Sequence, residues 1–90
     1  MAGDTDPGRP HEAVLRFSCP DERHARLVTD SVAVEEAAVA AVDDRSRTTV
    51  DRADDEVVVR VVAADLVALR AACGTWTRLV RVAERVAGGD

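Results

Sequence analysis

The residues of this chain that could bind a metal ion or act as nucleophiles are two cysteines and two histidines. Cys19 and His24 lie five positions apart, and His11 precedes them. Neither spacing matches the close ligand pairs that known zinc patterns contain. Cys73 falls in an apolar helical pattern and is expected to be a small core residue. We therefore expect no metal site, no cofactor and no disulfide.

No grouping of residues is typical of a catalytic site. The chain lacks a glycine-rich phosphate loop and a His-Glu-x-x-His motif, and its serines, histidines and aspartates suggest no triad. The carboxylate pairs Asp43-Asp44 and Asp54-Asp55 fall where turns are expected, and solvated carboxylates are poorly suited to acid–base catalysis. We expect no catalytic residue and a protein that is not an enzyme.

The charge balance bears on the kind of partner that the chain binds. Seventeen acidic residues face twelve basic ones, all arginine, for a net charge of −5. A free-standing RNA-binding protein normally has a basic excess, so strong RNA binding by this chain alone is disfavoured. The composition suits the acidic, lysine-free proteome of a halophilic microbe.

Length and hydropathy define the organisation of the chain. Ninety residues make one domain, which we place at residues 11–87, after a disordered lead at 1–10 and before a tail at 88–90. No segment approaches the roughly 20 apolar residues of a membrane span, and the lead has no signal-peptide pattern. We therefore expect a cytoplasmic protein.

The first half of the domain is predicted to be a strand followed by a helix. Apolar residues alternate over Glu12–Ser18, as in a strand with one buried face. After Pro20, a helix is expected to begin at Asp21-Glu22 and to reach about Glu35. The stretch Ala37–Val42 either extends this helix or leads in extended form to the next strand.

The second half of the domain is predicted to be a hairpin followed by a long helix. Residues 45–52 and 56–63 are rich in valine and threonine and flank a short turn. The helix has Asp65 as its N-cap and Gly88-Gly89 as its stop. The order β-α-β-β-α predicts an α+β fold, with a three-stranded antiparallel sheet and two helices packed on one face.

The other face of this sheet is expected to be half apolar and half arginine. It would carry Val58, Arg60 and Val62 together with Val14 and Arg16. A solvated face is normally more polar. Either a second copy or a different protein covers this face, or exposed valines are simply tolerated there.

The final helix divides into three arcs at about 100° per residue. One arc is expected to face the sheet: Leu66, Leu69, Cys73, Trp76, Val80 and Ala83. The opposite arc carries Arg70, Arg78, Arg81 and Arg85. These arginines either contact RNA phosphates or an acidic partner, or form an ordinary solvated face balanced by acidic residues of the first helix.

Small and β-branched residues, including Val86, lie between these arcs, and Gly74 lies among the arginines. Short side chains let another helix approach closely, and Gly74 costs roughly 1 kcal/mol in a helix relative to alanine. A glycine kept at such a cost indicates that something packs against it. We therefore predict a partner-binding helix surface formed by Ala68, Ala71, Gly74, Thr75 and Val82.

A set of short motifs extends this interpretation: Pro20, Val34-Glu35, Asp65, Ala68-Leu69-Arg70-Ala71, Thr75-Trp76 and Val82-Ala83-Glu84. In order and spacing, the chain over Glu12–Val86 resembles the small dimerising subunit of the archaeal KEOPS complex, particularly its haloarchaeal members. The resemblance implies a complex that installs threonylcarbamoyladenosine in tRNA, at the adenosine beside the anticodon. It also implies that this subunit is not the catalyst.

By the same resemblance, the subunit dimerises, binds the catalytic threonylcarbamoyl-transferase subunit through its helices and helps to hold tRNA. The family usually has Asn where this chain has Gly74, and only Asn can hydrogen-bond across an interface. A paralogue acting as heterodimer partner is therefore one alternative to a homodimeric scaffold subunit. Another is a stand-alone KH-like RNA-binding module, although the Gly-x-x-Gly loop of such modules is absent.

Overall fold

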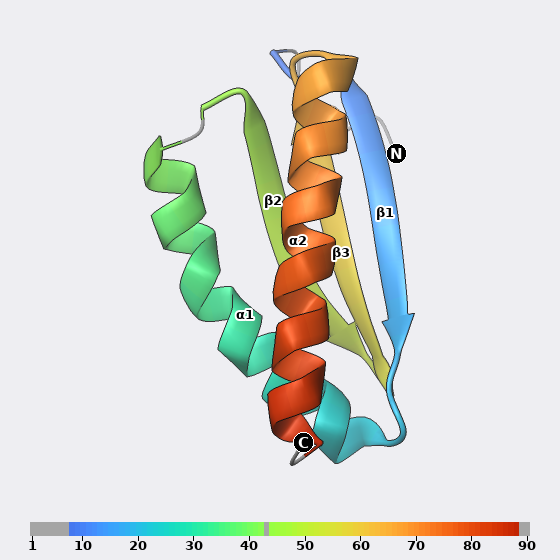
Figure 1. Cartoon of the computed structure of the whole chain (residues 1–90). Coiled ribbons are helices and arrows are strands. Elements are labelled where there is room, and N and C mark those ends of the chain that lie inside the picture. Colours follow the sequence, from blue (N-terminus) through green and yellow to red (C-terminus); the bar gives the residue numbers. More distant parts are fainter. Residues whose placement is uncertain (1–7, 43, 89–90) are drawn as a thin grey trace.

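The structure is a computed structural model that describes residues 8–42 and 44–88 (Figure 1). The predicted element order is confirmed: β1 (His11–Ser18), α1 (Glu22–Val42), β2 (Ser46–Ala53), β3 (Glu56–Ala63) and α2 (Leu66–Ala87). Most of the predicted disordered lead, Asp43 at the expected end of the first helix, and Gly89 of the expected stop lie outside the described residues.

The three strands form one antiparallel sheet in the order β1-β3-β2. Both helices cover the same face of this sheet, as predicted (Figure 1). Strand β3 is the central strand, because it pairs with a neighbour on each side along its whole length, from Glu56 to Ala63. The strands β1 and β2 are therefore the two edges.

The hydrophobic core lies between this sheet and the helices. Val57, Val59 and Val61 of β3 are fully buried, which follows from the two-residue period of a strand with one covered face. The helices contribute Val28 from α1 and Trp76 from α2, and Trp76 is the largest fully buried side chain. The core is thus built mostly from valine and alanine around one indole ring.

Helix α1 continues through the stretch that the sequence left ambiguous. Asp21 caps it by accepting a hydrogen bond from the His24 backbone N–H at 2.8 Å. The helix ends at Val42, seven residues beyond the expected end at Glu35. Its last two turns are held to the rest of the fold because Val39 packs on the core and Glu36 accepts a hydrogen bond from the Val50 backbone N–H at 3.0 Å.

The hairpin between β2 and β3 turns at Asp54 and Asp55 without a glycine. Asp54 adopts a left-handed conformation with φ 59°, which aspartate tolerates better than most residues. The Arg52 guanidinium donates a hydrogen bond to the Asp54 carbonyl at 2.8 Å and so supports the turn. The turn type that the sequence left open is therefore one in which aspartate takes the place usual for glycine.

Helix α2 begins at its predicted cap. The Asp65 carboxylate accepts a hydrogen bond from the Ala68 backbone N–H at 2.7 Å and also pairs with Arg45. At the other end, Gly88 is right-handed, with φ −79°, so the stop does not use the conformational freedom of glycine. Its backbone N–H instead donates to the Glu84 carbonyl at 2.9 Å.

The prediction that Leu66 faces the sheet, as part of the sheet-facing arc of α2, is wrong. Leu66 is 60% exposed, whereas Ala72, which was not assigned to that arc, is buried. The reason is rotational, because Leu66 lies about 80° around the helix from Trp76, the centre of the buried stripe. Cys73 is half-buried at the edge of the core, partly as expected.

Candidate functional site

An apolar groove runs between the two helices. Ser31, Val32 and Glu35 of α1 form one wall, and four residues of α2 form the other: Leu79, Val82, Ala83 and Val86. Val82 is 54% exposed and Val86 is 70% exposed, although both are hydrophobic. The groove therefore offers apolar surface that the fold itself does not cover.

Helix α1 extends this surface beyond the groove. Leu27 and Val34 are 38% and 73% exposed, and they lie four residues before and three residues after Ser31. On a helix, residues at these spacings are neighbours on one face. Contiguous exposed apolar surface of this kind marks interaction sites. We define the α1–α2 docking face as the groove residues together with Leu27 and Val34.

The predicted partner-binding residues divide between this face and the more N-terminal part of α2. The structure places Val82 in the groove beside α1. Ala68, Gly74 and Thr75 are half-buried and Ala71 is exposed, and none of these four lines the groove. The α1 wall of the docking face was missed by sequence reasoning, because only the tertiary structure shows which side of α1 meets α2.

Gly74 has room for a side chain within the monomer. A Cβ atom at this position would lie 3.7 Å from the Arg78 guanidinium, which is an ordinary van der Waals contact. No described residue of the chain therefore requires glycine here for steric reasons. Its cost to the helix is uncompensated in the isolated chain.

Gly74→Ala is expected to raise the free energy of unfolding of the isolated chain by about 0.5–1 kcal/mol, because alanine is the better helix former. Thermal denaturation followed by circular dichroism measures this difference. The exposed Ala71 provides the matched control, since Ala71→Gly on the same helix should lower stability by a similar amount. A lower melting temperature for Gly74→Ala contradicts the open space around this residue.

The four arginines of α2 form an exposed stripe. Arg70, Arg78, Arg81 and Arg85 are all exposed, and across residues 8–42 and 44–88 none of them forms an ion pair. Arginines near the sheet behave differently, since Arg16 pairs with Glu56 at 3.6 Å. The solvated-face alternative expected acidic residues of α1 to balance these arginines. Among the described residues, no direct ion pair joins the stripe to α1.

The face of the sheet that points away from the helices mixes valines with charged residues, as predicted. Val14 is 47% exposed, whereas Val62 is buried on the same face. Glu12 pairs with Arg60 across the strands, and the hydrogen bond from this guanidinium lowers the pKa of the Glu12 carboxyl. Of the three valines on this face, Val14 is exposed, Val58 is half-buried and Val62 is buried.

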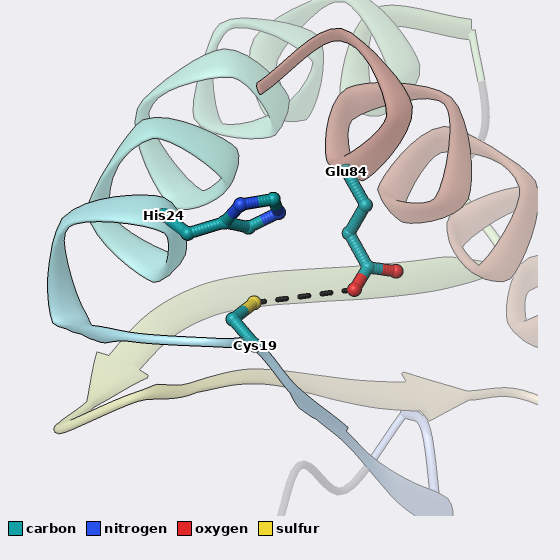
Figure 2. A group of neighbouring side chains, drawn as sticks. All are labelled: Cys19, His24 and Glu84. Atoms are coloured by element: carbon teal, nitrogen blue, oxygen red, sulfur yellow. Dashed lines mark hydrogen bonds between the residues drawn. The ribbon is translucent and has the colours of Figure 1, made fainter. Parts of the chain in front are cut away.

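The structure also brings together side chains that the sequence does not connect. Cys19 after β1, His24 on α1 and Glu84 on α2 point toward one another (Figure 2). The Cys19 thiol donates a hydrogen bond to the Glu84 carboxylate at 4.0 Å, and the ligand atoms of the three residues all lie within 4.8 Å of one another. His11, at the far end of β1, is not part of this group.

The environment of Cys19 disfavours its charged form. Burial raises the pKa of the Cys19 thiol, and the negative charges of Glu84, Asp55 and Asp21 raise it further. Burial also raises the pKa of the Cys73 thiol. These shifts are opposite to the lowered pKa that activates a cysteine as a nucleophile.

These features define a small two-layer α+β domain with an exposed docking face between its helices. Residues 12–88 match the family model described as Transcription factor Pcc1, and the chain belongs to this family, whose members are subunits of the KEOPS complex. Comparison with curated proteins finds no match. In the part of the chain that the structure describes, neither helix is long and apolar enough to cross a membrane.

Proposed function

We propose that the chain is a non-catalytic dimerisation and scaffold subunit of a cytoplasmic KEOPS complex. In this proposal it binds the catalytic threonylcarbamoyl-transferase subunit and supports formation of threonylcarbamoyladenosine beside the anticodon of tRNA. Membership of the Pcc1 family supports the complex, and the α1–α2 docking face supports the mode of binding. The exposure of Val82 and Val86 in an apolar groove is the observation that carries the proposal.

A helix of the catalytic subunit fits this docking face in chemical terms. Helices pack by inserting side-chain ridges into grooves, and the small Ala83 lets a ridge enter between Val82 and Leu79. Burial of apolar surface contributes about 25 cal/mol per Å², so the exposed valines supply affinity once covered. Glu35 on the opposite wall offers a carboxylate that selects partners with a basic residue at the rim.

Co-purification from the source cell tests this proposal. The tagged chain, extracted at the native intracellular salt concentration, is expected to recover the catalytic transferase subunit, identified by mass spectrometry. Native salt matters because an acidic, halophile-like surface repels itself when counter-ions are removed. Recovery of the tagged chain without the transferase subunit contradicts the proposal.

Dimerisation is assigned in this proposal to the open face of the sheet. That face lies opposite the helices, so a second copy there leaves the docking face free for the catalytic subunit (Figure 1). The apolar side chains that a second copy would cover are the exposed Val14 and the half-buried Val58. Light scattering on the isolated chain distinguishes a homodimer from a monomer, and a monomer favours the heterodimer with a paralogue.

The arginine stripe of α2 is expected to contribute to tRNA binding by the assembled complex. Replacing Arg70, Arg78 and Arg81 together with alanine should weaken tRNA affinity about tenfold or more at moderate salt. It should also reduce the slope of log affinity against log salt by about 2–3, since each lost phosphate contact removes roughly 0.7–0.9. Filter binding over a salt series measures both quantities.

A control for this prediction removes the same charge from other parts of the surface. Arg23 and Arg26 on α1 and Arg47 on β2 are also exposed. Their joint replacement with alanine should change tRNA affinity less than replacement of the stripe. Equal effects of the two triple variants, or none, assign the stripe to the solvated-face alternative.

A further inference from the structure

The Cys19–His24–Glu84 cluster lies apart from the α1–α2 docking face. None of its three residues lines that groove, and none belongs to the arginine stripe. Its members come from three different elements: the link after β1, the first turn of α1 and the last turns of α2. A thiol, an imidazole and a carboxylate therefore converge from separate elements, and the local sequence around each residue does not account for their proximity.

The backbone at each of these positions is held in place. The Cys19 N–H donates to the Asp55 carbonyl at 2.8 Å, and the His24 N–H donates to the Asp21 carboxylate at 2.8 Å. The Glu84 carbonyl accepts a hydrogen bond from the Gly88 N–H at 2.9 Å, and Gly88 lies beside the His24 ring.

The three side chains are the types that zinc binds. Zinc takes thiolate sulfur at about 2.3 Å, imidazole nitrogen at about 2.0–2.1 Å and carboxylate oxygen at about 2.0–2.2 Å. Tetrahedral angles at these bond lengths place the ligand atoms about 3.3–3.6 Å apart. The observed separations are 4.0 Å for sulfur to oxygen and at most 4.8 Å for the other pairs. Small side-chain rotations would shorten them to the distances of a tetrahedral site.

The charges around the cluster are mixed but favour a cation at the sulfur. Glu84, Asp55 and Asp21 surround the thiol with negative charge, which attracts a metal ion and is relieved by it. Arg81 and Arg85 line the solvent-accessible hollow beside His24 and Glu84 and oppose binding at longer range. These arginines are exposed, so solvent screens them more than it screens the buried sulfur.

We propose that Cys19, His24 and Glu84 bind one Zn²⁺ ion that ties the link after β1 to both helices. The hollow beside His24 and Glu84 leaves the fourth coordination position to water. On binding, the Cys19 thiol releases its proton to solvent, and the sulfur–carboxylate hydrogen bond is replaced by two metal–ligand bonds. In this arrangement the ion links the three elements independently of the docking face.

Cobalt titration of the full chain tests this site, because a Co²⁺–thiolate bond gives a near-ultraviolet charge-transfer band. We expect saturation at one Co²⁺ per chain and displacement of the band by Zn²⁺. Cys19→Ser should abolish the band, and Cys73→Ser, which removes the other cysteine, should leave it unchanged. His24→Gln and Glu84→Gln should each weaken Co²⁺ binding at least tenfold.

Thermal denaturation gives a second readout that does not depend on cobalt. Zinc at about 100 times its dissociation constant stabilises the folded chain by about 2.7 kcal/mol and should raise the melting temperature by about 11–22 °C, because only the folded chain forms the site. The same shift is expected for Cys73→Ser but not for Glu84→Gln. Glu84 and His24 are only half-buried, so their glutamine variants report on the site even if Cys19→Ser fails to fold. Unchanged metal affinity in both glutamine variants, or no saturable binding by the parent chain, overturns the proposal.

Discussion

Replacing Val82 with glutamate is expected to weaken binding of the catalytic transferase subunit by about 100-fold or more. Val82 is 54% exposed in the isolated chain and lies in the α1–α2 groove opposite Glu35. A carboxylate there is buried when the partner covers the groove, and it meets the like charge of Glu35. Burial of an unpaired charge costs several kcal/mol, and about 2.7 kcal/mol corresponds to 100-fold. Isothermal titration calorimetry with the purified subunit measures the change.

Val67 provides the matched control for this variant. It is an equally large hydrophobic residue of α2, it is 79% exposed, and it does not line the groove. Val67→Glu introduces the same charge and should change the affinity less than threefold, about 0.7 kcal/mol. Both variants should retain the parent melting temperature within a few degrees, because neither side chain contributes to the core. If Val82→Glu binds as well as Val67→Glu, the catalytic subunit docks elsewhere.

The fold was predictable from local signals in the sequence. The alternation over Glu12–Ser18 is typical of a strand with one covered face, and the structure shows that alternation of burial along β1, which begins one residue earlier, at His11. The cap at Asp65 was predictable because a carboxylate before an apolar helical pattern has one favourable use, to accept a backbone N–H. These signals involve neighbours in the chain, and they determine the order of the elements.

Other features depended on contacts that local patterns do not report. The stretch Ala37–Val42 has no strong periodicity, and its helical state is supported by Glu36 and Val39, which contact the sheet and the core. Leu66 has the spacing of a core residue but lies at the side of the buried stripe. In both cases the position of the helix on the sheet decides the outcome.

The functional surfaces are mostly tertiary in origin. Val82 was predicted to bind a partner because small and β-branched residues follow one side of α2, but the groove that it lines also requires Ser31 and Glu35 from α1. The cluster is still less visible, because Cys19 and Glu84 are 65 positions apart. The spacing of Cys19 and His24 alone matches no zinc pattern. The third residue of the cluster, Glu84, becomes evident only when α2 is placed beside the link after β1 (Figure 2).

Replacing Trp76 with alanine is expected to have the largest effect on the stability of the chain. Trp76 is 1% exposed and is the largest fully buried side chain, in a core otherwise made mainly of valine and alanine. Its removal should cost about 3–5 kcal/mol, out of about 5–13 kcal/mol for a chain of this length. The melting temperature should fall by at least about 12 °C, measured by circular dichroism.

Trp76→Phe is the control, and it separates the contribution of the aromatic ring from that of the indole N–H. The indole N–H has no hydrogen-bond partner among the described residues, so phenylalanine loses area but no hydrogen bond. It also removes an unpaired buried donor, and its cost should stay below about 1.5 kcal/mol. A loss as large as that of alanine would show that the N–H is satisfied, for instance by water.

The Trp76 and Val82 variants also separate folding from docking. Trp76→Ala lowers the folded fraction, and partner binding to the folded state opposes this loss by mass action. Its deficit in complex formation should therefore disappear at a high concentration of the catalytic subunit. Val82→Glu keeps the fold and loses the contact, so its calorimetric dissociation constant stays raised while its melting temperature does not change. This difference is expected because Trp76 supports the docking face from within the core, whereas Val82 is part of that face.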